Sequence, residues 1–430
     1  MILSALSLPF FAPIEAPSST SIMANPISSV SPTTPTTATE NAKNLSRPFL
    51  LVAICKKIVF IFIFLTAAFC SSAQTVTTPA KILTPNLLVG TYTKKGSKGI
   101  YVLSFDTATG KATEISHTNS ASNPSFLTLS KDHQQVYAVS EGSEGKVSAY
   151  SFADNKLNLI QEKSTKGADP CYITLSPDQS NLFIANYSGG SITSYHRFAD
   201  GRLSNPQQFI QHIGSSVNTA RQEKAHIHGV FFSPDGKYVL TPDLGMDEIS
   251  IYPYQTKNGP PLQIQKATSI QSSPGAGPRH LCFSNNGKFI YVIEELTGSI
   301  SVYRFIKGVA SFLQKVVTHP SNFKGTLASA DIHLSPDGLF LYATNRGTEN
   351  NIVSFKVLPN GKLEEKSIQY YSTEGKAPRN FTMNKEGNWL LVANQDSDNI
   401  IAFRRNIQTG ALSSTGVSIK LSMPVCLLFY

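Results

Sequence analysis

The hydrophobic and polar positions of this chain follow one pattern, which is clearest between residues 277 and 305. That segment, GPRHLCFSNNGKFIYVIEELTGSISVYRF, contains two short apolar runs and a run of alternating apolar and polar residues, separated by turns at 284–287 and 296–298. Short runs bounded by turn residues predict β-strands. The Asn286-Gly287 pair favours a tight hairpin, because glycine adopts a positive φ without a Cβ clash. We therefore predict three antiparallel strands in this segment.

The same pattern recurs along the chain at a nearly constant period. Copies begin at residues 123, 169, 225, 277, 328 and 377, with spacings of 46, 56, 52, 51 and 49 residues. Self-similarity at this period, with about four strands in each copy, is typical of β-propeller blades. The fourth, outer strand of each blade is expected in the variable stretches between copies, such as 157–165 and 363–372.

Two partial copies lie at the ends of the repeating region. Residues 86–105 contain a second and a third strand without a first, whereas residues 423–430 resemble a first strand alone. Pairing these ends would complete a seventh blade and remove two open sheet edges, which are sites of aggregation. The sequence therefore predicts an all-β fold, a seven-bladed β-propeller with four-stranded antiparallel blades that forms one domain over residues 74–430.

Residues 1–73 do not follow the repeat. A low-complexity stretch rich in Ser, Thr, Pro and Ala precedes Lys56 and Lys57, a 13-residue apolar run and the small residues that end at Ala73. These are the parts of a secretory signal, so we predict a signal segment at 56–73, cleavage after Ala73, and an exported protein that is periplasmic or secreted. The run is shorter than the roughly 20 residues of a membrane-spanning helix. An uncleaved anchor and a lipid anchor at Cys70 are the alternatives.

Charge and cysteine content narrow the function classes. The net charge is +9, but the basic residues are dispersed, so we expect no nucleic-acid partner, whereas an anionic small molecule is compatible with the charge. Cys171, Cys282 and Cys426 fall in three predicted first strands, and an odd, scattered set favours buried free thiols over disulfides. No nucleophile elbow, phosphate loop or metal-binding motif is present, so we predict no cofactor and no metal.

Superposing the copies places two rings of residues at one mouth of the central channel. One ring is the start of the first strand, and the other is the end of the second strand. Only 15% of the chain is charged, yet ionisable residues collect on these rings, namely His226, His228, Asp243, Arg279, His280, Glu295, Arg346 and Arg379. Guanidinium groups bind carboxylate or phosphate in a fork, and imidazole exchanges protons near neutral pH. The rings therefore predict a site for an anionic, oxygen-rich ligand, with ion pairing between blades as the structural alternative.

The motifs of six blades together resemble the seven-bladed β-propeller lactonase family. They include PCYITLSPD, HIHGVFFSPDGKYVLTPDLGMD, GPRHLCFSNNGKFIYVIEEL, ADIHLSPDGLFLYATNRG and PRNF, and the resemblance extends over about residues 85–430. The family includes bacterial 6-phosphogluconolactonases and eukaryotic carboxymuconate-cyclising enzymes. By its motifs, the resemblance implies functional roles for His228, Arg279, Glu295 and Arg346, and it aligns the PRNF arginine with Arg379.

The resemblance implies metal-independent hydrolysis of a sugar lactone. We expect His228 to act as a general base, Glu295 to orient it or exchange protons, and Arg279 to stabilise the oxyanion. Arg346, Arg379, His226, Asp243 and His280 are expected to bind substrate. The alternatives are a muconate-type cyclase, a non-catalytic periplasmic propeller that binds a carbohydrate or small acid, and a protein-interaction platform. The substrate and the oligomeric state stay open.

Overall fold

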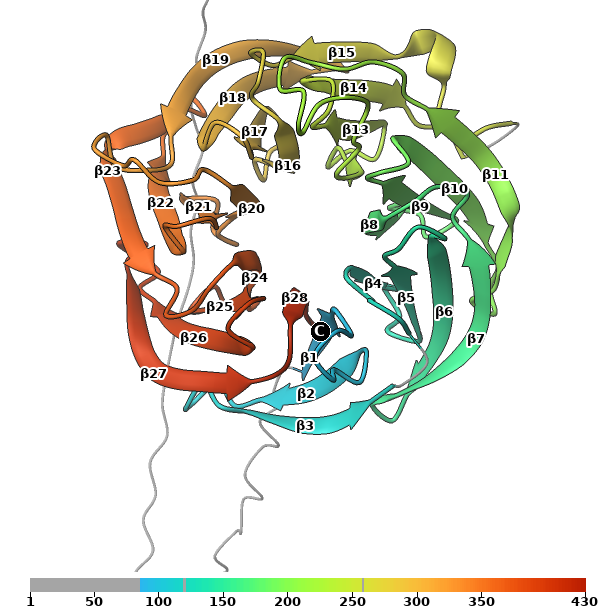
Figure 1. Ribbon diagram of the computed structural model, residues 1–430, viewed down its shortest axis with the longest axis horizontal. Coiled ribbons are helices and arrows are strands. Elements are labelled where there is room, and N and C mark those ends of the chain that lie inside the picture. The colour runs from blue at the N-terminus through green and yellow to red at the C-terminus, as the bar shows by residue number, and fades with distance from the viewer. Residues whose placement is uncertain (1–85, 119–120, 257–258) are drawn as a thin grey trace, which may run out of the picture. The chain divides into compact units, whose positions relative to one another are not determined.

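The computed structural model describes residues 86–118, 121–256 and 259–430. Within these ranges the chain forms seven antiparallel sheets of four strands each, arranged in a ring around a central axis (Figure 1). The region around this axis is called the channel below. The predicted seven-bladed propeller is confirmed. The predicted extension, signal segment and cleavage site at 1–73 lie outside the described residues. No helix of the described ranges has the length and apolar character needed to cross a membrane.

Each blade has the same four strands in the same order, although β4 and β12 are shorter than the other first strands. The first strands, next to the channel, are β4 (Leu127–Leu129), β8 (Pro170–Leu175), β12 (Phe231–Phe232), β16 (Pro278–Phe283), β20 (Ser329–Leu334), β24 (Pro378–Met383) and β28 (Pro424–Phe429). The second strands are β5 (Gln135–Ser140), β9 (Asn181–Asn186), β13 (Tyr238–Asp243), β17 (Phe289–Glu294), β21 (Phe340–Asn345), β25 (Trp389–Asn394) and β1 (Asn86–Thr91).

The two outer strands of each blade complete the sheets. The third strands are β6 (Lys146–Ala153), β10 (Ser191–Arg197), β14 (Glu248–Pro253), β18 (Ser299–Ile306), β22 (Asn351–Val357), β26 (Asn399–Arg405) and β2 (Tyr101–Phe105). The fourth strands are β7 (Lys156–Ser164), β11 (Leu203–Gln211), β15 (Thr268–Gln271), β19 (Val309–Val317), β23 (Leu363–Ser372), β27 (Leu412–Lys420) and β3 (Ala112–His117). Among the described residues, one 3₁₀ turn is present, η1 (Ile264–Lys266), which precedes β15.

The two ends of the propeller share one sheet, in the order β28-β1-β2-β3. In Figure 1, β28 (red) lies beside β1 (blue). Antiparallel pairing joins Leu87 to Phe429 and Gly90 to Cys426. The predicted closure is confirmed, and β28 leaves β1 without a free edge.

The core consists of layers between neighbouring blades. The second strands are almost entirely buried, because alternate side chains of one strand pack against different neighbours. In β17, Ile290 and Val292 join the cluster shared with β13 and β14, whereas Tyr291 and Ile293 join the cluster shared with β21 and β22. This two-sided burial explains why the second strands read as continuous apolar runs.

The turn between the first and second strands is fixed by a repeated serine. Ser176 Oγ accepts a hydrogen bond of 2.9 Å from the Asn181 amide and donates one to the Asp178 carboxylate. The same pair of bonds is made by Ser130, Ser233, Ser284 and Ser335 in their own blades, with Asn286 in place of the aspartate in one of them. These bonds explain the recurring S-P-D pattern in the sequence.

Cys171 and Cys426 are buried and Cys282 is partly buried, and all three are free thiols as expected.

Candidate active site

One residue of each blade follows directly after its second strand and enters a ring at the channel mouth. In blade order these residues are Tyr92, Glu141, Tyr187, Leu244, Glu295, Arg346 and Gln395. The ring therefore combines acidic, basic and aromatic side chains at equivalent positions of different blades. A repeat that only held the blades together would not need such different residues there.

A β-bulge recurs at the start of the first strand. The register between first and second strands shifts after Pro170, Pro278, Ser329 and Pro378, so that two residues oppose one. The extra residues include Cys171, Arg279, Asp331 and Arg379. A bulge leaves its extra residue out of the ladder and re-aims its side chain, which is a common device beside active sites.

Three arginines surround the Glu295 carboxylate. Arg221 Nη2 donates to Oε1 over 2.7 Å, while Arg279 Nε and Arg346 Nη2 lie 3.0 and 2.9 Å from Oε2. Arg279 also donates from Nη1 to the Ala330 carbonyl over 2.6 Å. Glu295 is 4% exposed and Arg279 only 1%, so these charges are held away from bulk water.

The charges in this cluster set one another's pKa values. Burial by itself raises the pKa of Glu295, but Arg346, Arg279 and Arg221 outweigh burial and lower it to about 2. Burial, together with the neighbouring charges of Arg346 and Arg379, lowers the pKa of Arg279 to about 9. At neutral pH the carboxylate is therefore ionised and the guanidinium still carries its proton.

His228 lies among groups that keep it neutral. Its ring packs against the rings of Tyr187 and His280, with centroids 5.3 and 5.2 Å away, and Cys171 Sγ lies 3.7 Å from Nδ1. Burial and the positive charge of Arg279 lower the pKa of His228 well below its ordinary value. A neutral imidazole can accept a proton from water at neutral pH, as a general base must.

Asp331 holds the neighbouring imidazole in place. Its Oδ1 lies 2.8 Å from Nδ1 of His280, and its Oδ2 lies 2.9 Å from Nε2 of His333. Asn380 Nδ2 donates to the same Oδ2 over 2.5 Å. Burial and Arg279 lower the pKa of His280 to about 4, although Asp331 opposes that shift. His280 is thus a fixed, neutral group beside His228.

His226 and Asp243 lie next to this group but bind mainly to the protein. His226 stacks on Tyr187 with ring centroids 4.5 Å apart, and its Nε2 is 3.2 Å from Glu223. Asp243 is fully buried, accepts from the His226 amide over 2.7 Å, and lies 2.9 Å from Nδ1 of His212. These contacts support the loop at the mouth, and a role of either residue in substrate binding stays a prediction.

A second polar group lies in the same channel. The Tyr92 hydroxyl lies 2.9 Å from both carboxylate oxygens of Glu141, and the Arg379 guanidinium carbon is 5.5 Å from the centre of the Tyr92 ring. Arg379 contributes to the lowered pKa values of both His228 and Arg279. The charge of Arg379 in this second group therefore affects the protonation of His228 and Arg279 in the first.

The chain matches the family model "Lactonase, 7-bladed beta-propeller" over residues 86–429. The chain belongs to this lactonase family. A 6-phosphogluconolactonase of Formosa agariphila is 38% identical over 334 residues, which are 76% of this chain and 94% of that protein. A Bacillus subtilis 6-phosphogluconolactonase is 31% identical over 79% of this chain and 97% of its own.

Solved structures of the lactonase family resemble the propeller closely. A crystal structure described as a putative 6-phosphogluconolactonase from Bacteroides fragilis is 39% identical, with a TM-score of 0.77, covering 82% of this chain and 99% of that one. The periplasmic gluconolactonase of Pseudomonas aeruginosa is 36% identical, with a TM-score of 0.74, covering 80% and 98%. The predicted family is confirmed, and these relatives carry names of lactone hydrolases.

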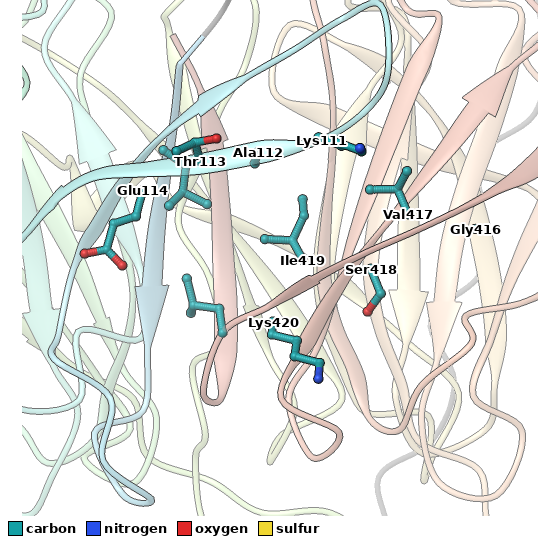
Figure 2. A pocket seen from close by; sticks show the side chains of 11 residues that line it. Lys111, Ala112, Thr113, Glu114, Gly416, Val417, Ser418, Ile419 and Lys420 are labelled. Atoms are coloured by element: carbon teal, nitrogen blue, oxygen red, sulfur yellow. The ribbon is translucent and has the colours of Figure 1, made fainter.

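A groove lies on the outer rim of this lactonase-family propeller, and none of the mouth residues lines it. It has a volume of about 500 Å³ and runs between the outer strands β3 and β27, lined by residues 111–114 and 416–421 (Figure 2). It contains Lys111, Glu114 and Lys420 but no imidazole. In the described part of the chain no three His, Cys, Asp or Glu residues are grouped as a metal site requires. The expectation of a metal-free site stays a prediction.

Several residues of the mouth were not singled out from the sequence. Glu141, Tyr187 and Asp331 lie on the two predicted rings. The repeat therefore predicts where they lie but not what they do. Arg221 lies between β11 and β12, outside the repeat. The one signal for it was the 56-residue spacing, the longest between copies, which marks an insertion before that blade. Glu295 was expected to orient His228, and the contacts found for it are with arginines instead.

Proposed function

We propose that this protein hydrolyses a sugar lactone at the channel mouth. The observation that carries the proposal is the buried imidazole of His228, which packs on His280, while Arg279, the neighbour of His280 in the chain, is ion-paired with the Glu295 carboxylate. Relatives over most of the chain are named 6-phosphogluconolactonases. The substrate class that we propose is a gluconolactone or its 6-phosphate.

The reaction adds water across the ester bond of the ring. His228 accepts a proton from water as the oxygen attacks the lactone carbonyl, which becomes a tetrahedral oxyanion. Arg279 and Arg346 stabilise that oxyanion, because fixed positive groups in a water-poor site interact strongly with developing charge. The ring C–O bond then breaks, and the departing oxygen takes the proton back from His228. Water and lactone together give one hydroxy acid.

Glu295 supports this reaction by holding the arginines. Arg221 donates a hydrogen bond to the carboxylate and Arg279 and Arg346 are ion-paired with it, so the three side chains are held in place before substrate arrives. With a pKa of about 2 the carboxylate stays ionised and does not serve as a proton donor at neutral pH. We therefore assign it a positioning role. His280 is held by Asp331 and packs on His228, so we infer that it fixes the plane of the catalytic ring.

The test is acid release from glucono-1,5-lactone and its 6-phosphate by the purified protein, measured against spontaneous hydrolysis. We expect acceleration that His228→Ala reduces at least 100-fold. His196→Ala serves as the matched control, because His196 is exposed on β10. Unchanged acceleration in a folded His228→Ala protein would disprove the mechanism. Saturable binding without acceleration would instead support a non-catalytic binding protein, and formation of lactone from an unsaturated acid would support a cyclase.

We also propose that the protein is exported. The basic, apolar and small-residue order of residues 56–73 supports this, and so does the name of the periplasmic gluconolactonase from Pseudomonas aeruginosa. Expression of the full chain in a Gram-negative host should give a periplasmic protein that begins at Gln74. A protein that keeps residues 56–73 in the cell membrane fraction would show an uncleaved anchor.

A further inference from the structure

Arg379 has donors available for a ligand. It is the extra residue of the bulge in β24 and is only partly buried. Among the described residues, no hydrogen bond or ion pair of its side chain accompanies the contact with the Tyr92 ring at 5.5 Å. Arg279 and Arg346, by contrast, both lie within 3.0 Å of Glu295. A guanidinium in a partly buried position normally has acceptors for its donors, from the protein or from water, so Arg379 is a candidate for ligand contact.

An acceptor group lies beside these donors. The Tyr92 hydroxyl bonds to Glu141 at 2.9 Å, and burial raises the pKa of that phenol, so the proton stays on tyrosine and points to the carboxylate. Glu141 has two oxygens with about four acceptor sites, and one donor does not fill them. Tyr92 and Glu141 are both partly buried and not fully enclosed.

This group is next to the proposed reacting residues. Burial and Arg279 are the main causes of the low pKa of His228, and Arg379 adds to them. Burial raises the pKa of the Cys171 thiol most, while Glu141 adds to that rise and Arg379 opposes it. Cys171 is itself 3.7 Å from the imidazole of His228. A molecule whose carbonyl lies at His228 would therefore bring the remainder of a short chain within reach of Tyr92, Glu141 and Arg379.

We propose that Tyr92, Glu141 and Arg379 form a subsite for the hydroxyl groups of an uncharged sugar tail. The inference rests on the proposed function and narrows its substrate to the unphosphorylated lactone. Adjacent hydroxyls each offer a donor and an acceptor, which match a carboxylate beside a guanidinium. A phosphate offers acceptors only and carries nearly two negative charges, so Glu141 repels it. Glu141 thereby selects for hydroxyl and against phosphate.

The experiment compares three lactones in wild type, Glu141→Gln and Tyr92→Phe. The lactones are glucono-1,5-lactone, its 6-phosphate, and δ-valerolactone, which has the same ring without hydroxyls. Both substitutions leave the shape of the side chain almost unchanged. Thermal melting of each variant checks that it is folded. The control is Glu144→Gln, which removes the same charge from an exposed position three residues further along.

We expect Glu141→Gln to lower kcat/KM for gluconolactone by about 10-fold, mainly through KM, because a charged acceptor is lost. In the same variant, kcat/KM for the 6-phosphate should rise relative to kcat/KM for gluconolactone, and kcat/KM for δ-valerolactone should not change. Tyr92→Phe should also lower kcat/KM for gluconolactone. Equal losses of kcat/KM on all three lactones would overturn the proposed subsite. A preference of the wild type for the 6-phosphate that is unchanged in Glu141→Gln would overturn it as well.

A separate measurement distinguishes failure of the subsite from failure of the proposed activity. If wild type accelerates none of the lactones, the activity is wrong, and titration calorimetry with gluconate then tests the subsite alone. Weaker gluconate binding in Glu141→Gln than in wild type and Glu144→Gln supports the subsite. Equal binding in all three proteins, or no binding, overturns it.

Discussion

Arg346 Nη2 lies 2.9 Å from Oε2 of Glu295, and each of these residues directly follows the second strand of its own blade. Equivalent positions of adjacent blades therefore meet as an ion pair across a blade boundary. The repeat brings these two positions together, and the side chains of Glu295 and Arg346 carry the opposite charges. At the same two positions, a hydrogen bond joins Tyr92 of the closing blade to Glu141 of the next blade.

Replacing Glu295 with glutamine should destabilise the protein strongly. Three guanidiniums would lose their shared carboxylate, and breaking a buried ion pair by removing one partner costs about 3–5 kcal/mol. Denaturant unfolding at pH 7 measures the loss. Asp200→Asn removes a carboxylate from a surface pair with Arg202 and should leave the unfolding midpoint unchanged. Equal midpoints for Glu295→Gln and wild type would contradict the prediction.

The stabilisation by Glu295 should also depend on pH. Its pKa in the folded protein is about 2, below the ordinary value of 4.5, so the carboxylate binds fewer protons when folded. The contribution is then complete above about pH 4.5 and is lost as pH falls toward 2. The difference in unfolding free energy between wild type and Glu295→Gln should shrink over this interval. A difference that grows on acidification would have the wrong sign.

The pH dependence of hydrolysis should have two limbs. His228 must be neutral, and burial with Arg279 lowers its pKa, so kcat/KM should fall only well below pH 6.5. Arg279 must carry its proton, so kcat/KM should fall as pH rises through about 9. Because Arg379 also lowers the pKa of His228, Arg379→Gln should move the acid limb to higher pH. Rates corrected for spontaneous hydrolysis test both limbs, and an acid limb near 6.5 in wild type would argue against His228 as the base.

The sequence predicted most of the fold because the pattern repeats. Six copies of one strand–turn–strand pattern mark equivalent positions, and residues such as Arg279 and Glu295 could then be placed on common rings. Arg221 could not be placed, because it belongs to a connection without equivalents in other blades. The bulges at Cys171, Arg279 and Arg379 were also not foreseen, since one extra residue at the start of a strand leaves the apolar pattern unchanged. Partners such as Tyr92 for Glu141 depend on closure of the ring.

Gly245 is needed for the close approach of two backbones at the channel mouth. A Cβ at this position would lie 1.8 Å from the Lys224 carbonyl and 2.8 Å from the His226 amide. Gly245→Ala should therefore shift the 224–226 segment and cost about 1–3 kcal/mol. Gly142→Ala is the control, because a Cβ there meets nothing within 4 Å. Differential scanning calorimetry should show a lower Tm for Gly245→Ala alone, and equal Tm values would refute this steric argument.

Removing residues 424–430 should prevent the propeller from closing. β28 buries Val425, Cys426 and Leu427, and Phe105 packs on Phe429 with ring centroids 5.3 Å apart. Burial of such side chains contributes about 1.5–3 kcal/mol each, so their loss approaches the whole stability of a typical domain. The truncated chain would also expose the edge of β1. We expect it to aggregate in size-exclusion chromatography, whereas removal of Tyr430 alone should leave a monodisperse protein.

A circular permutant tests whether strand pairing or chain order is responsible for closure. The backbone of Asn86 bonds to that of Tyr430 in both directions, at 3.1 and 3.0 Å, so a short turn can join residue 430 to residue 86. With new ends opened between β27 and β28, all seven blades would be built from consecutive strands. We expect this permutant to fold and to keep its hydrolytic activity, because no contact of the ring is lost. An inactive or aggregated permutant, beside an active wild type, would mean that the separated ends themselves are needed for the fold.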